Sequence, residues 1–170
     1  QTLHQMKYNI TYMNETVKHL ILSIYLGTEA DYLLDVSDAD NNIFDINLTL
    51  NKMTTSIINN NPFVQSIYVY NPQEGLFFST YKEMCYEDEE LINALKTYKT
   101  VPMLEPIARR GQDSKDNEGV FTYAMYESNS PNGVFDGAVF VNVNAGLIIN
   151  NLKSINNGDA KSEFFVLSDK

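Results

Sequence analysis

The first 25 residues carry the pattern that most constrains how this chain folds. Apolar side chains recur there at alternating intervals of three and four residues, without a miss: Leu3, Met6, Ile10, Met13, Val17, Leu20 and Ile24. This series predicts one α-helix with a continuous apolar stripe. At about 1.5 Å per residue, the helix is roughly 35–40 Å long before Gly27 can end it.

Two interpretations of this helix stay open at this level. In the first it is an ordinary core helix, because Ile21, Leu22 and Tyr25 widen the apolar stripe of its C-terminal half, which suits packing on a larger body. In the second it is a stalk that rises from a membrane and pairs with a second copy. The N-terminal half has a narrow stripe flanked by Gln, Lys and Asn, and it suits the stalk better.

The rest of the chain predicts an α+β fold with an antiparallel sheet. Helical periodicity predicts helices at 44–59, 87–98 and 145–155. Alternating apolar residues predict strands at 63–70, 76–80, 120–127, 138–143 and from 164 onward. Between them we expect an acidic linker at 28–45, an extended connector at 101–107 and a polar, mobile loop at 109–119. Helices and strands do not alternate as in βαβ units, so a parallel sheet is not expected.

Composition excludes several functional classes. The chain has 12 Lys and Arg against 22 Asp and Glu, a formal charge of −10, which disfavours binding of nucleic acid by this segment. Its single cysteine, Cys85, excludes an internal disulfide and a multi-cysteine metal site.

No run of about 18 apolar residues, the length needed for a transmembrane helix, is present. The sequence begins inside a helical pattern without Met, and we expect it to be a piece of a longer protein.

Catalytic groups are scarce, so we expect no enzyme, no cofactor and no metal site. His4 and His19 are fifteen residues apart on the first helix, about 22 Å along its axis, which is too far for a shared site. Cys85 has no histidine nearby in sequence to act as a base. A hydrolase that uses unrecognised pairs of carboxylates is the remaining catalytic alternative.

The chain is rich in tyrosine and phenylalanine, with 11 Tyr, 9 Phe and no Trp. Many lie on predicted strands, and one face of the sheet could present rings with polar tips to a small molecule. Arg109, expected on a loop, is the best candidate to bind a carboxylate or phosphate, although it could equally be an exposed surface charge. The candidate ligand-binding residues are Tyr68, Tyr70, Arg109, Tyr123, Met125 and Phe140. The alternative is that these rings only fill two halves of a core.

Five segments together resemble a known family. They are residues 13–20 (MNETVKHL), 61–71 (NPFVQSIYVYN), 78–80 (FST), 121–127 (FTYAMYE) and 137–144 (GAVFVNVN). They resemble the extracellular double-Cache (PAS-like) sensor domains of Gram-positive YesM-like histidine kinases and of membrane-spanning AraC-type transcription regulators. The resemblance covers nearly the whole chain, and its motifs are strand-core patterns.

The resemblance implies three parts: a stalk helix at 1–27 that leaves a transmembrane segment, a membrane-distal PAS-like sensor at 28–158, and the start of a truncated membrane-proximal subdomain at 159–170. It also implies an extracellular position in a membrane-anchored parent, whose output is a kinase or a DNA-binding domain. The implied partners are a small molecule or an extracellular solute-binding protein, and a second copy through the N-terminal helix.

One departure from the family bears on the ligand. The amino-acid-binding version of this fold has an Arg-x-x-Trp-Tyr signature, whereas here Arg110 is followed by Gly111, Gln112 and Asp113, and the chain has no Trp. Sugars, oligosaccharides, peptides or a partner binding protein therefore stay open as inputs. The alternative function, from another class, is a structural or adhesive surface module without a small ligand.

Overall fold

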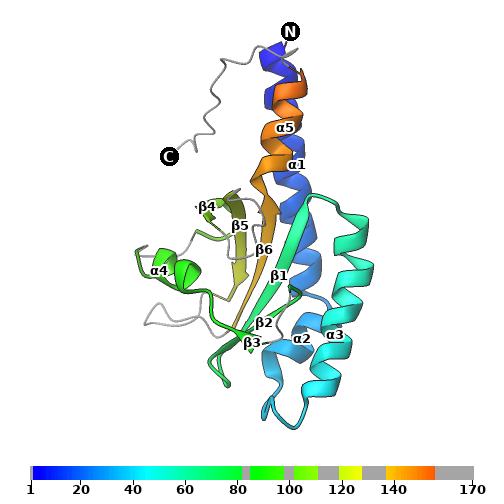
Figure 1. The fold of residues 1–170 in the computed structure, drawn as a ribbon, viewed down its shortest axis with the longest axis vertical. Coiled ribbons are helices and arrows are strands. Elements are labelled where there is room, and N and C mark those ends of the chain that lie inside the picture. The colour runs from blue at the N-terminus through cyan, green and yellow to red at the C-terminus, as the bar shows by residue number, and fades with distance from the viewer. Residues whose placement is uncertain (1, 82–84, 98–101, 111–118, 128–136, 156–170) are drawn as a thin grey trace.

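The fold is built on a six-stranded antiparallel sheet. The structure is a computed structural model, and it describes residues 2–81, 85–97, 102–110, 119–127 and 137–155. The strand order is β3-β2-β1-β6-β5-β4, with every neighbouring pair antiparallel (Figure 1). The strands are β1 (Val64–Asn71), β2 (Leu76–Ser79), β3 (Cys85–Tyr86), β4 (Ile107–Arg110), β5 (Gly119–Tyr126) and β6 (Ala138–Asn144). The expected α+β class is confirmed.

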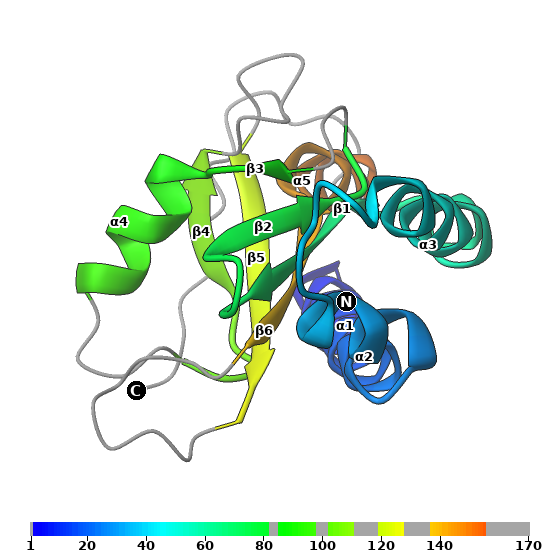
Figure 2. The same cartoon turned by 90° about the horizontal axis from the view of Figure 1, so that it is seen from below.

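Helices cover the two faces of the sheet unequally. Figure 2 shows α1, α2 and α3 on one side of the sheet and α4 on the other. The fifth helix, α5, follows β6 directly and rises beside the N-terminal part of α1 (Figure 1). The helices are α1 (Thr2–Tyr25), α2 (Thr28–Asp35), α3 (Ile43–Ser56), α4 (Glu89–Thr97) and α5 (Ala145–Ile155). We call the two sides of the sheet the α1 face and the α4 face.

Strand alternation divides the buried residues into two clusters. On the α1 face, Val69 and Val141 pack in the same cluster as Ile21 of α1. On the α4 face, Tyr68 and Phe140 pack with Leu91 of α4. Strand β6 lies in the middle of the sheet and is buried on both faces from Ala138 to Val143, which explains why all of these residues except Asn142 are apolar.

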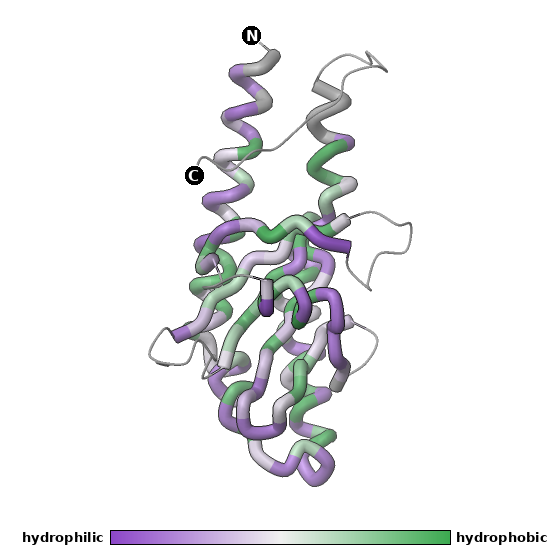
Figure 3. Tube along the Cα trace, turned by 90° about the vertical axis from the view of Figure 1, so that its left-hand side faces the viewer, coloured by the Kyte–Doolittle hydropathy of each residue, from purple (hydrophilic) through white to green (hydrophobic). Residues whose placement is uncertain are grey.

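The long first helix is confirmed, and its two halves differ in burial. Val17 and Ile21 have no exposed surface, and Ile24 has 5%. In the N-terminal half, Tyr8 and Tyr12 are each 66% exposed, and their rings stack with centroids 6.4 Å apart. Figure 3 shows this end of α1 projecting beyond the sheet together with α5. The helix is therefore a core element in its C-terminal half and a projecting rod in its N-terminal half.

Two expectations about local structure were wrong, and one strand was not predicted. Part of the acidic segment 28–45 is a helix, α2, because Ala30 and Leu33 lie one turn apart and are both buried. Arg109 does not lie on a loop but in β4, which pairs with β5. The short strand β3 was not anticipated. The strand expected from 164 and the subdomain expected at 159–170 lie outside the described residues.

A buried asparagine fastens α2 to the end of β1. The Nδ2 of Asn71 donates to the carbonyl oxygens of Leu33 and Val36, both at 2.8 Å. Its Oδ1 accepts from the backbone N–H of Gln73 at 2.9 Å and of Glu74 at 3.0 Å. The Asn71 side chain thus supplies hydrogen-bond partners to carbonyl groups at the C-terminal end of α2 and to N–H groups of the β1–β2 turn. Asn71 is fully buried, so water could not take its place.

Replacing this residue tests the arrangement. We expect Asn71→Ala to lower the free energy of unfolding by roughly 2–4 kcal/mol, because it leaves buried backbone groups without partners. Asn47→Ala on the exposed side of α3 is the matched control and should change stability by less than about 0.5 kcal/mol. Urea denaturation followed by circular dichroism measures both. Equal effects of the two substitutions would contradict the anchoring role of Asn71.

Candidate ligand-binding site

A buried polar network crosses the α4 face at Arg109. Only 2% of the Arg109 side chain is exposed, and its Nη1 lies 2.6 Å from Oδ2 of Asp88, which is fully buried. The Arg109 Nε donates to Oγ1 of Thr122 at 2.6 Å, and Nη2 donates to Oδ1 of Asn142 at 3.0 Å. The guanidinium therefore binds three different oxygens in a fixed plane, which a lysine ammonium could not reproduce.

The network continues across the sheet through neutral side chains. Thr122 Oγ1 donates to Asn142 Oδ1 at 2.6 Å, and Asn142 Nδ2 donates to Ser66 Oγ at 2.9 Å. These residues stand side by side because Thr122 pairs with Asn142 and Asn142 pairs with Ser66 in the strand register. One row of polar residues thus joins β4, β5, β6 and β1.

Asp88 connects this row to α4. Its Oδ1 accepts the backbone N–H of Leu91 at 2.8 Å, so it caps the helix N-terminus, where the macrodipole favours a negative charge. The other oxygen, Oδ2, accepts from the Tyr86 hydroxyl at 3.2 Å as well as from Arg109. The buried carboxylate is consequently held by a cation, a helix end and a phenol at once.

Beside the network lies a cluster of aromatic rings. The Tyr68 ring packs edge-on against Tyr86, with centroids 5.1 Å apart, and Phe77 contacts the rings of Tyr70 and Phe140. The guanidinium carbon of Arg109 lies 5.9 Å from the centre of the Tyr68 ring, within range of a cation–π interaction. Tyr70, Tyr86 and Tyr126 are only half-buried, so the cluster has a partly accessible, tyrosine-rich rim.

The structure separates the six predicted ligand-binding residues into two groups. Tyr68, Tyr70, Phe140 and Arg109 lie on the α4 face, in or beside the aromatic cluster. Tyr123 and Met125 lie on the α1 face, in the cluster that contains α1. A single site formed by all six is therefore wrong, because the residues of β5 alternate between faces and these two point away from Tyr68.

Sequence reasoning missed the partners of Arg109. The sequence pattern predicts Asp88 only as part of the helix at 87–98, and Thr122, Asn142 and Ser66 only as part of strands. A signal was nevertheless present, because Thr122 and Asn142 interrupt apolar stretches of neighbouring strands, and Ser66 pairs with Asn142. Aligned polar positions in neighbouring central strands indicate a buried hydrogen-bond network.

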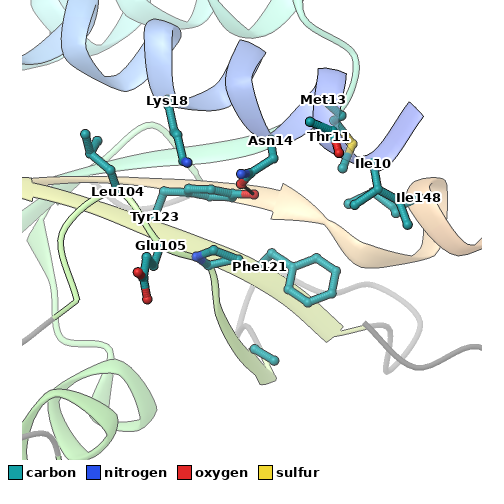
Figure 4. Close-up of a pocket in the computed structure, with 12 residues that line it drawn as sticks. Ile10, Thr11, Met13, Asn14, Lys18, Leu104, Glu105, Phe121, Tyr123 and Ile148 are labelled. Atoms are coloured by element: carbon teal, nitrogen blue, oxygen red, sulfur yellow. Dashed lines mark hydrogen bonds between the residues drawn. The ribbon is translucent and has the colours of Figure 1, made fainter. Parts of the chain in front are cut away.

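A pocket of about 340 Å³ lies on the α1 face, between α1 and the β4–β5 edge (Figure 4). Its walls come from α1, from the 104–106 connector, from β4 and β5, and from Ile148 of α5. Most of the lining is apolar, but Lys18, Asn14 and Tyr123 bring polar groups to one region. On the rim, Leu104 has a φ of +59°, which is uncommon for a branched, non-glycine residue.

Tyr123 links the sheet to α1 at this pocket. Its hydroxyl donates to Oδ1 of Asn14 at 2.9 Å. Burial, and secondarily the nearby charge of Glu15, raises the pKa of Tyr123 to about 12. Burial thus disfavours the charged phenolate, and the protonated hydroxyl is the hydrogen-bond donor to α1.

In the described segments, no three His, Cys, Asp or Glu side chains are grouped as metal ligands. No helix in the part of the chain that the structure describes is long and apolar enough to cross a bilayer. His4 and His19 are both exposed on α1.

Comparison with known proteins extends only to the fold. No protein-family model matches the chain, and no curated protein matches its sequence. The structure is similar to the sensory domain of the Campylobacter jejuni chemoreceptor Tlp3 (CcmL), solved with isoleucine bound, with a TM-score of 0.55 and 14% sequence identity. The match covers 89% of this chain and 60% of that chain. The expected PAS-like (Cache) architecture is thereby confirmed.

The buried ion pair can be tested by a double-mutant cycle. We expect Arg109→Met to lower the free energy of unfolding by about 3–5 kcal/mol, because it leaves the Asp88 carboxylate buried without its cation. Asp88→Asn should also destabilise, and the double variant should lose clearly less than the sum of the two. Arg110→Met, at the exposed neighbour, is the control and should be nearly neutral. Additive losses in chemical denaturation would show that the two residues are not coupled.

Proposed function

We propose that this chain is the extracellular ligand-sensing domain of a bacterial membrane receptor, and that α1 transmits its signal. The observation that carries the proposal is the division of α1. One half is fixed in the core of a PAS-like domain, and the other half projects beyond the sheet beside α5 (Figures 1 and 3). Such a helix can pass a displacement of the sheet to a distant part of the parent protein.

The proposed input surface is the α4 face. There Tyr70, with Tyr86 and Tyr126 on the half-buried rim, would contact the ligand, and Tyr68, Phe140 and Arg109 would support them from below. Aromatic rings supply apolar contact and their hydroxyls supply orientation, a combination suited to a small molecule. The similarity to a chemoreceptor sensory domain with isoleucine bound supports a small-molecule input.

Strand β5 is the proposed connection between the ligand and α1. Thr122 and Ala124 belong to the α4 face, whereas Tyr123 between them bonds to Asn14 of α1. A ligand that shifts β5 from the α4 face therefore changes the Tyr123–Asn14 contact on the opposite face. In the parent, the projecting half of α1 would pair with a second copy and lead to a kinase or an AraC-type output.

A second candidate function is a structural or adhesive module without a small ligand. The observation that favours it is the dense packing of the aromatic cluster, in which Tyr68, Phe77 and Phe140 are at most 4% exposed. In that case, the rings only stabilise the domain. The two functions differ in whether any small molecule stabilises the folded chain.

A thermal-shift screen of sugars, amino acids, short peptides and carboxylates separates the two candidates. A ligand at a hundred times its dissociation constant should raise the melting temperature by roughly 5–10 °C. Tyr70→Leu should weaken that ligand by about tenfold, since a rim ring and its hydroxyl are lost, whereas Tyr8→Leu on the projecting helix should not. A screen in which no compound class stabilises the domain, and no solute-binding protein binds it, would favour the structural module.

The role of β5 has its own test. Tyr123→Phe keeps the ring and removes only the hydroxyl that bonds to Asn14. We expect it to leave ligand affinity within about twofold and to reduce the ligand-induced change in hydrogen exchange over the N-terminal half of α1. Tyr12→Phe, on an exposed ring of the same helix, is the matched control. An unaltered exchange response in Tyr123→Phe would exclude this route.

A further inference from the structure

The pocket on the α1 face has the features of a binding site of its own. Its volume of about 340 Å³ falls within the range of small-molecule sites. At roughly 30 Å³ per water-sized group, it holds on the order of ten such groups. It shares no lining residue with the aromatic rim of the α4 face. An occupant here would therefore be a second ligand, not the one placed on the α4 face.

The lining has two chemically different ends. Figure 4 shows Ile10, Met13 and Ile148 together at one end, with Phe121 below them. At the other end, Lys18 and Asn14 point from α1 toward Tyr123, while Glu105 lies on the opposite rim. An elongated molecule with an apolar tail and a polar head matches this division.

The polar end favours a head group that accepts hydrogen bonds and carries negative charge. Because the Tyr123 hydroxyl donates to Asn14 Oδ1, the Asn14 amide nitrogen is the group that remains to donate into the pocket. Lys18 adds an ammonium whose side chain is 31% exposed and whose partner is the exposed Glu15, at 3.1 Å. That surface pair is weak, so Lys18 can turn from Glu15 to a ligand at little cost. Glu15 and Glu105 are negatively charged and would repel such a head group. As carboxylates they cannot donate a hydrogen bond to it.

We propose that this pocket binds an aliphatic monocarboxylate of medium chain length, with its tail between α1, β5 and α5 and its carboxylate at Lys18 and Asn14. The bound molecule would touch α1 at the point where the helix leaves the core, and β5 on the same face. It could thus influence the projecting half of α1 without any contact with the α4 face.

Sodium octanoate, below its micellar concentration, is the probe for the intact 170-residue chain. We expect saturable binding by isothermal titration calorimetry, with NMR shifts concentrated in the residues that line the pocket. Thr11→Phe fills the apolar end from an exposed helix position and should abolish binding. Asn9→Phe, on the other side of the same helix, should leave binding unchanged, and circular dichroism confirms that both variants fold.

The head-group assignment is tested separately. Lys18→Met should weaken octanoate by about tenfold, since a charge-assisted hydrogen bond is lost, and Lys7→Met on the same helix should not. Binding of 1-octanol should be insensitive to Lys18→Met. Octanoate binding that survives Thr11→Phe would place the ligand elsewhere, and octanoate binding that is unchanged by Lys18→Met would contradict the placement of the carboxylate at Lys18. An absence of octanoate binding would overturn the proposal and would leave the α4-face screen unaffected.

Discussion

The buried ion pair between Arg109 and Asp88 is the constraint on which the arrangement of the sheet and α4 depends. Both charges are almost completely removed from water, and neither could stay there without the other. Their hydrogen bonds reach Thr122 and Asn142 in neighbouring strands and the N-terminus of α4. A slip of one residue in any of these strands would turn a polar partner to the other face and leave a buried charge unsatisfied. The network therefore specifies the register of these strands.

The same network explains why Arg109 is poorly suited to be the primary contact for an anionic ligand. A ligand carboxylate would have to displace Asp88, and that displacement would also uncap α4 and release the Tyr86 hydroxyl. Uncapping a helix and stripping a buried carboxylate of its partners are both costly. Arg109 instead holds the buried residues beneath the tyrosine rim in place, and under the proposed function a ligand on the α4 face would meet a preorganised surface.

The sequence was sufficient for elements whose pattern is long and local, and insufficient where the deciding partner is distant. The α1 series, the β1–β2 hairpin and α5 were all predicted, since each depends on its own periodicity. The short helix α2 was missed because only Ala30 and Leu33 among many acids mark its buried side. Arg109 was assigned to a loop because its stabilising partners lie 13 to 33 residues away. The division of the aromatic candidates between faces depended on the register of β5 against β6, which no local pattern specifies.

Under the proposed function, the division of α1 also indicates where a signal would act on the helix most easily. Its C-terminal half cannot move without opening the close-packed cluster around Val17 and Ile21, whose disruption would cost several kcal/mol. The neighbouring turn is held to the sheet by the Asn14–Tyr123 hydrogen bond, and a pocket beside it leaves this part of the helix less closely packed than the turn at Val17. Small rearrangements of this turn would therefore cost little free energy. Because the projecting half of the helix is long, a small tilt at the turn would move its far end by a larger distance. In the proposed route, a change on either face of β5 would act on this turn, because Tyr123 of that strand hydrogen-bonds to Asn14 of the helix.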